Sequence, residues 1–235
     1  GYNLRFEGIY MDSTIWLNGS LVGEWKYGYS TFEIDITDAL KPGENELLVR
    51  VVLQIPNSRW YSGAGIYRNV WLKAVPELHF ASDGIYISTV KKEACWTVRV
   101  QSEIECIDRE NEFDLSNACI IRHTIIDSDG KMLAANEGAA TTLELKVIDP
   151  DLWRLDNPAL YTLKSELLRD GKVIDVEYNR FGFRTIRFDA NEGFFLNDEK
   201  VKIHGVCQHH DLGALGAAIN RTAIKRQLLI LKEMG

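Results

Sequence analysis

The sequence lacks a surplus of positive charge. Its 235 residues include 27 Lys and Arg against 34 Asp and Glu, which gives a formal net charge of −7, and no basic run or stripe stands out along the chain. Binding to nucleic acid depends on cations that neutralise phosphates, so we expect no nucleic-acid partner.

Long apolar runs are also missing. No apolar stretch approaches the roughly 20 residues that a membrane helix needs, so we expect no membrane partner. The first five residues, GYNLR, contain neither the basic segment nor the apolar core of a signal peptide. Because we expect the chain to begin inside a longer protein, this leaves the compartment unknown, with a bacterial cytoplasm and periplasm both compatible.

Cysteine is scarce. The four cysteines, at 95, 106, 119 and 207, are irregularly spaced and form no C-x-x-C pair. Such a set is too small for a disulfide framework. We expect buried free thiols, with a single bridge as the alternative.

The first 75 residues show the two-residue period of β-strands. Residues 32–36 alternate apolar and acidic side chains, which is typical of a strand with one face on a core. Asn18-Gly19 lies between two apolar segments and predicts a tight hairpin, because both residues tolerate positive φ. The apolar run at 47–53 is typical of a strand buried on both faces. A last strand is predicted at 70–75.

Pro76 follows as the expected joint to a second region, 76–183. Short strands are predicted at 85–87, 96–100, 120–126, 143–147, 161–168 and 173–178, with reversals at Asp129-Gly130 and Asp170-Gly171. About 100 residues with six or seven short strands have the size and rhythm of an immunoglobulin-like β-sandwich. The Cys…Trp…Cys spacing of antibody domains is absent, so only the architecture is similar.

The last region, 184–235, changes character. Residues 194–203 predict a hairpin, and a helix is predicted from the N-cap Asn220 to Met234, with Gly235 at the stop position. Its apolar stripe is so wide that only a large apolar partner covers it, and the preceding sequence offers none. We therefore expect the opening βα unit of a longer α/β domain, in a truncated chain.

Four motifs in order resemble glycoside hydrolases of family two, of the β-galactosidase kind. They are WYSGAGIYRNVWL at 60–72, preceded by LNG at 17–19 and GYSTF at 28–32; LWRLDNPALY at 152–161; FGFR at 181–184; and KIHGVCQHHD at 202–211. The resemblance implies a mainly β fold with the C-terminal part of a sugar-binding jelly-roll sandwich in 1–75. It further implies an immunoglobulin-like sandwich in 76–183 and the first βα unit of a catalytic (β/α)₈ barrel in 184–235.

The family's chemistry is retaining hydrolysis by two carboxyl groups about 5 Å apart. Both glutamates lie on later barrel strands, and Glu192, Glu199 and Glu233 match neither motif. The resemblance thus implies no catalytic residue in this chain, which we expect to be inactive alone, and a full-length enzyme that hydrolyses β-linked oligosaccharides or glycosides. No cofactor is expected here; magnesium or sodium sites of the full-length enzyme would lie mostly beyond Gly235.

His209 and Asp211 are the substrate-binding residues that the resemblance implies. In the family these positions hold hydroxyls of the sugar, a task that suits imidazole and carboxylate because together they donate and accept hydrogen bonds. His210 stands where related enzymes often carry glutamate. The alternative is that these side chains cap the strand and bond to backbone.

Arg59 and Trp60 are the second substrate-binding pair. In the family the loop at 56–61 reaches the rim of the pocket, where an aromatic ring stacks on sugar and arginine bonds hydroxyls. Alternatively, Trp60 and Tyr61 pack against protein. The remaining tryptophans, at 16, 25, 71, 96 and 153, are expected in cores.

A metal site is the alternative hypothesis for the motif at 202–211. The motif offers five potential ligands within eight positions, namely His204, Cys207, His209, His210 and Asp211. On a strand, alternation places two of these histidines, 204 and 210, on the face opposite the other three ligands, so we expect no metal.

Two further functional hypotheses stay open: a stand-alone carbohydrate-binding module and a structural β-sandwich without a ligand. Unpaired strand edges and the uncovered helix face favour association, so a homo-oligomer is also expected, with local disorder as the alternative.

Overall fold

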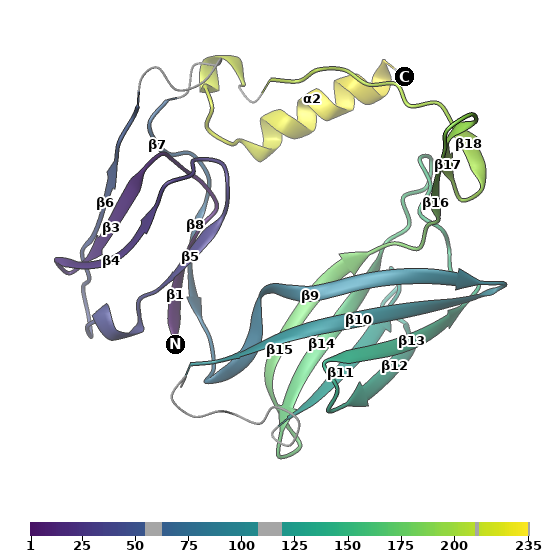
Figure 1. Ribbon diagram of the computed structural model, residues 1–235, viewed down its shortest axis with the longest axis horizontal. Helices are drawn as coiled ribbons and strands as arrows, with labels where there is room; N and C mark the ends of the chain where they lie inside the picture. The colour runs from purple at the N-terminus through teal and green to yellow at the C-terminus, as the bar shows by residue number, and fades with distance from the viewer. Residues whose placement is uncertain (55–62, 108–118, 210–211, 235) are drawn as a thin grey trace. The chain divides into compact units, whose positions relative to one another are not determined.

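The chain folds mainly as antiparallel strands joined by short turns, as the computed structural model in Figure 1 shows. It describes residues 1–54, 63–107, 119–209 and 212–234. The chain divides into two compact units, one formed by Gly1–Val75 with Val206–Gly235 and the other by Pro76–Gly205. None of the described helices has the length and apolarity to span a membrane.

Two three-stranded sheets and one strand pair form the β part of the first unit. β1 (Tyr2–Phe6) lies between β5 (Phe32–Asp35) and β8 (Val70–Ala74), β3 (Ser13–Leu17) lies between β4 (Ser20–Trp25) and β6 (Leu47–Val51), and β2 (Ile9–Tyr10) pairs with β7 (Gly65–Ile66). A short 3-10 helix, Thr37–Ala39, follows β5.

Alternation along these strands builds the core of the first unit. Leu4 and Phe6 of β1 are buried with Ile15 of β3, and Phe32 stacks on Phe6 with ring centroids 5.1 Å apart. The alternating strand predicted at 32–36 is thereby confirmed. The hairpin at Asn18-Gly19 is also confirmed, since φ is 52° and 84° at these two residues.

The prediction that residues 47–53 are buried on both faces is wrong. Leu47 and Leu48 of β6 are 40% and 61% exposed. β6 pairs with β3 alone among the described strands, so it is an edge strand. Only Val49 and Val51 of β6 are partly buried against the core. Strand character was read correctly, but the degree of burial depends on neighbours that a local pattern does not specify.

Two other expectations about single residues need correction. Of the tryptophans predicted in cores, Trp96 is buried, whereas Trp25 is partly exposed and Trp71 is half exposed. All four cysteines are free, as predicted, but only Cys119 is buried.

The second unit contains a two-sheet sandwich. One sheet has the order β13-β10-β9 and is formed by β9 (Leu78–Lys92), β10 (Cys95–Cys106) and β13 (Thr142–Ile148). The other sheet has the order β12-β11-β14-β15 and is formed by β11 (Ile120–Ile126), β12 (Met132–Gly138), β14 (Tyr161–Arg169) and β15 (Lys172–Phe181). All six strands predicted in this region are present. β12 was missed, because its sequence MLAANEG has little apolar alternation.

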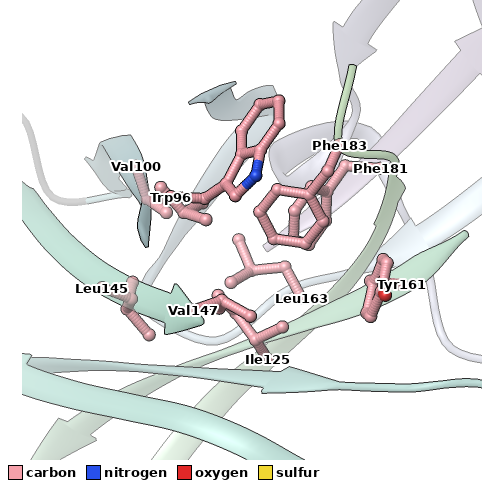
Figure 2. Packing of buried hydrophobic residues seen from close by; sticks show 10 residues of the cluster. Trp96, Val100, Ile125, Leu145, Val147, Tyr161, Leu163, Phe181 and Phe183 are labelled. Atoms are coloured by element: carbon pink, nitrogen blue, oxygen red, sulfur yellow. The ribbon is translucent and has the colours of Figure 1, made fainter. Parts of the chain in front are cut away.

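An aromatic cluster fills the centre of this sandwich (Figure 2). Trp96 meets Phe183 with ring centroids 5.4 Å apart, and Tyr161 meets the same ring at 4.9 Å, both edge to face. Phe181 packs against Phe183 at 5.2 Å. Strands from both sheets and the chain just after β15 therefore share one core, since edge-to-face pairs add to the stabilisation from burial.

The last residues of the chain form a small sheet, a 3-10 helix and a helix. β16 (Ile186–Asp189), β17 (Gly193–Leu196) and β18 (Glu199–Val201) are followed by the 3-10 helix Gly213–Leu215 and by α2 (Arg221–Glu233). The predicted N-cap is confirmed, because the Asn220 side chain accepts a hydrogen bond from the Ala223 amide at 3.0 Å.

The exposure of α2 and the pairing of residues 202–209 bear on the expectation that this region opens a longer α/β domain. Leu228 and Leu229 of α2 are about half exposed, whereas Ile224 and Leu231 of the same stripe are partly buried, so the described part of the chain covers the apolar stripe only in part. Residues 202–209, which resemble a barrel strand, form no ladder with a described strand. In a (β/α)₈ barrel the ladder partners of a strand are its neighbouring strands.

The sandwich of the second unit buries His123 between its strands. His123 on β11 is fully buried, and its two ring nitrogens lie 2.9 Å from the Ser165 hydroxyl and 3.3 Å from the Ser102 hydroxyl. Burial lowers the pKa of His123 to about 4. The ring is therefore neutral at physiological pH, with a hydrogen-bond partner at each nitrogen.

We predict that the sandwich loses stability as the pH falls from about 6.5 to about 4. The unfolded chain binds a proton at the ordinary histidine pKa of 6.5, whereas the folded chain does so only near 4. The free energy of unfolding should fall by roughly 3 kcal/mol over this interval on account of His123. Urea denaturation at pH 7 and pH 4 measures it.

The matched variants are His123→Gln and His204→Gln, the latter at an exposed histidine of the same unit. His204→Gln should keep the pH dependence, and His123→Gln should lose the histidine part of it whatever its stability at pH 7. Equal losses in the wild type and His123→Gln would contradict the assignment.

Candidate functional site

A cavity of about 410 Å³ opens in the first unit. We call it the tyrosine cavity. Its lining comprises Tyr10, Tyr29, Gly63, Ala64, Gly65, Ile66, Tyr67, Gly216, Ala217 and Ala218. These residues come from β2, from the segment before β5, from β7 with its flanks, and from the segment between Gly213–Leu215 and α2. The volume falls within the range of small-ligand pockets, about 300 to 1,000 Å³.

The tyrosine rings of the cavity pack edge to face. Tyr29 lies at the centre of the group, with ring centroids 5.2 Å from Tyr10, 5.8 Å from Tyr27 and 6.4 Å from Tyr67. Tyr10 is only 6% exposed, whereas Tyr29 is 37% exposed. Tyr27, which does not line the cavity, is 61% exposed, so among the packed rings Tyr29 is the partly exposed one that also lines the cavity.

Tyr67 joins three segments that are distant in the sequence. Its hydroxyl donates to the Gly28 carbonyl oxygen at 2.8 Å, and its own carbonyl accepts from the Ile219 amide at 3.0 Å. Its ring lies so close to Gly8 that a Cβ there would come within 2.8 Å of the ring. Burial raises the pKa of the Tyr67 phenol, which keeps the hydroxyl protonated as a donor.

Only glycine fits at position 28, beside the ring of Tyr10. A Cβ at Gly28 would lie 2.3 Å from the Tyr10 ring, so any other residue would displace that ring. The GYS sequence at 28–30 thus places a backbone against Tyr10 and the adjacent Tyr29 in the wall of the cavity.

None of the described residues that line the tyrosine cavity is charged. The neighbouring Arg68 lies over the Tyr67 ring, with its guanidinium carbon 5.0 Å from the centroid, and donates to the Glu7 carbonyl oxygen at 3.4 Å. The polar groups that the described residues contribute to the lining are phenols and backbone amides, which both donate and accept hydrogen bonds.

Of the site residues predicted from the sequence, only one is described. His209 is exposed and belongs to the same unit as the tyrosine cavity, but it is not among the residues that line it. Arg59, Trp60 and Asp211 lie outside the described residues, as does His210. Beside His209, the Gln208 amide donates to the Gln227 side chain of α2.

The metal hypothesis gains no support from the described residues, in which no group of three His, Cys, Asp or Glu is placed to hold an ion. Two of its five candidate ligands, His210 and Asp211, are outside this part of the chain.

The three tyrosines were missed at the level of sequence. Tyr29 and Tyr67 lie inside the motifs GYSTF and GIYR, and Tyr10 lies in β2. Each is two residues or fewer from a glycine, Gly8, Gly28 or Gly65. An aromatic beside a glycine signals a close approach of ring and backbone, but it does not tell which segments meet.

Comparisons with known proteins agree across the chain. The family description "Glycosyl hydrolases family 2, sugar binding domain" matches residues 1–76, and "Glycosyl hydrolases family 2" matches residues 79–184. A β-galactosidase of Bacteroides ovatus is 40% identical over the whole chain, and a putative β-glucuronidase of Formosa agariphila is 35% identical over 99% of it.

Solved structures match in the same way. A glycosyl hydrolase family 2 member from Bacteroides cellulosilyticus superposes with a TM-score of 0.89 at 38% identity, covering all of this chain and 31% of that one. The chain spans 28% of the length of the B. ovatus protein and 22% of the F. agariphila protein.

The contact of Tyr67 with Gly28 yields a prediction. Tyr67→Phe removes the hydroxyl and leaves the Gly28 carbonyl oxygen without this donor, so we expect the free energy of unfolding of the first unit to fall by about 1 kcal/mol. Urea denaturation measures the change. Tyr86→Phe, at an exposed tyrosine of β9, is the control and should change stability little. Equal effects of the two substitutions would rule out a structural role for the Tyr67 hydroxyl.

Proposed function

Because the chain belongs to family 2 of the glycosyl hydrolases, we propose that it is part of a longer retaining β-glycosidase, a β-galactosidase in the first instance. The observation that carries the proposal is that two descriptions of this family match consecutive parts of the chain, 1–76 and 79–184. The 40% identity to a β-galactosidase over all 235 residues supports the choice of a galactoside.

Retaining hydrolysis uses one carboxyl group as acid and base and a second as nucleophile, about 5 Å apart across the scissile bond. The motifs of this chain resemble parts of the family that lack both groups. We therefore assign the catalytic glutamates to the longer protein and give this chain a role in binding the substrate, with no catalytic residue of its own.

His209 and Asp211 are proposed to hold hydroxyls of the sugar. The imidazole of His209 is exposed, as a group that meets a ligand must be. A histidine and a carboxylate together offer both donors and acceptors, and a sugar hydroxyl left unmatched in a closed pocket costs about 1 to 3 kcal/mol. Arg59 and Trp60 are proposed to contact the same substrate.

A non-catalytic role in carbohydrate binding is the second candidate. It is favoured by one specific observation, the tyrosine cavity within residues matched as a sugar-binding domain and the segment 216–218. The two functions are compatible, because binding by this chain does not require the glutamates.

We expect the longer protein to hydrolyse an aryl β-galactoside, and the 235-residue chain alone to give a rate equal to that of buffer. A chromogenic assay on both proteins measures this, with an aryl β-glucuronide as the competing substrate. Failure of the longer protein to cleave any β-glycoside would contradict the proposal. Turnover by the chain alone that survives purification would show that our placement of the catalytic glutamates is wrong.

Substitution of His209 tests its proposed role. In the longer protein, His209→Ala should lower kcat/KM for the aryl β-galactoside about 10- to 100-fold, the effect of losing one or two hydrogen bonds to the substrate in the transition state. His204→Ala, at another exposed histidine of the same motif, is the control. Similar kcat/KM values for the two variants would refute a contact between His209 and the sugar.

A further inference from the structure

A pocket of about 440 Å³ opens in the second unit, and all of its described lining residues belong to that unit. We call it the Trp153 pocket. Its lining includes Ile87 of β9, Trp153 and Leu160 before β14, Phe181 at the end of β15, and Arg184 in the chain that follows. The volume lies in the lower part of the range of small-ligand pockets, about 300 to 1,000 Å³, which suits a ligand of one or two rings.

Trp153 forms a fixed wall of this pocket. Its amide donates to the Phe183 carbonyl oxygen at 2.8 Å, and its carbonyl accepts from the side-chain amide of Asn197 at 3.0 Å. A Cβ added at Gly182 would lie 3.1 Å from the Trp153 Cβ, so the backbone packs tightly against this residue. Trp153 nevertheless stays partly exposed. A wall that is in place before the ligand arrives loses little conformational entropy on binding.

Apolar side chains make up most of the rest of the described lining. Phe181 is 9% exposed and packs against Phe183 in the core of the sandwich, with ring centroids 5.2 Å apart. Ile186 of β16 also lines the pocket but is 50% exposed, so much of its apolar surface is open to water. An aromatic ring that enters the pocket would cover such surface, and its removal from water favours binding.

Arg184 adds a positive charge to this apolar lining. Its guanidinium carbon lies 5.0 Å from the centroid of the Trp153 ring, which is within the range of a cation–π contact. That contact keeps the planar group at the pocket and leaves its N–H donors for other partners. Among the described residues, none forms an ion pair or hydrogen bond with the Arg184 side chain. A carboxylate is the acceptor that suits it best, because two parallel N–H···O bonds form at once.

We propose that the Trp153 pocket is a binding site for an aromatic carboxylate, whose ring lies against the apolar lining and whose carboxylate pairs with Arg184. Both parts of the ligand are needed, because an ion pair exposed to water adds little affinity by itself and an apolar ring alone leaves the guanidinium unused. The pocket contains none of the residues to which substrate binding is assigned, so this proposal is independent of the proposed function.

Isothermal titration calorimetry of the 235-residue chain at neutral pH tests the proposal with three probes: phenylacetate, phenylacetamide and acetate. We expect saturable binding of phenylacetate with a Kd of about 1 mM or below. Phenylacetamide lacks the charge and acetate lacks the ring, so each should bind at least about tenfold more weakly. The proposal is overturned if phenylacetate does not bind saturably, or if either of the other probes binds within about tenfold of its affinity.

Substitution of Arg184 tests the pairing with the carboxylate. Arg184→Gln should lower the affinity for phenylacetate at least about tenfold, because it removes the charge and the paired N–H donors. Arg99→Gln, at an exposed arginine on β10 of the same unit, is the matched control and should bind phenylacetate as the wild type does. Unchanged binding by Arg184→Gln, or an equal loss in the two variants, would show that Arg184 does not hold the ligand.

Filling the pocket tests where the aromatic ring lies. Thr89 of β9 lines the pocket, and Thr89→Phe places a ring in that space while Arg184 stays in place. Phenylalanine is favourable in a strand, so we expect a folded protein by circular dichroism, with at least about tenfold weaker binding of phenylacetate. If this variant does not fold, the smaller Thr89→Leu replaces it. Unchanged affinity in a folded Thr89 variant would place the ligand outside the Trp153 pocket and overturn the proposal.

Discussion

The hydrogen bond from the Tyr67 hydroxyl to the Gly28 carbonyl oxygen, 2.8 Å long, fixes the site that the first unit offers. It holds the backbone that carries Tyr29 beside β7, while the Tyr67 carbonyl holds the segment before α2 through the Ile219 amide. Close packing of the Tyr67 ring on Gly8 adds the strand that leads to Tyr10. Because the walls of the cavity come from these separate segments, its shape depends on the contacts of this one side chain.

The second unit illustrates how a buried polar group differs from a functional one. His123 with Ser102 and Ser165 has the residue types of a nucleophile and its base, and its pKa is lowered to about 4. All three residues are buried, so a substrate has no access to them. Each ring nitrogen is within hydrogen-bonding distance of a serine hydroxyl, and a satisfied buried network of this kind helps to specify a unique core. This is a structural role, and it makes the sandwich sensitive to acid.

Local features could be predicted from the sequence because their causes are local. The Asn18-Gly19 turn needs two residues that accept positive φ, and the N-cap of α2 needs a side chain such as that of Asn220. Burial of β6 could not be predicted, since it depends on which strands lie beside it.

The tyrosine cavity could not be predicted from the sequence either, because it depends on contacts between distant segments. The tyrosine cavity arises where segments distant in the sequence meet, and a motif identifies Tyr29 and Tyr67 without showing that they share a wall with Tyr10. Resemblance to a family predicts His209 as a substrate contact, and the structure adds that His209 is exposed and is not among the residues that line the cavity. The roles of Arg59, Trp60 and Asp211 stay predictions.

We propose that this chain contributes substrate-binding residues to a longer retaining β-glycosidase, to which hydrolysis is assigned. The most direct test of that division is labelling of the longer protein with a mechanism-based β-galactoside inhibitor, followed by mass spectrometry of its proteolytic peptides. Since retaining hydrolysis passes through a covalent glycosyl-enzyme intermediate, we predict that the label lies on a glutamate outside these 235 residues. A label on a residue of this chain would contradict the division.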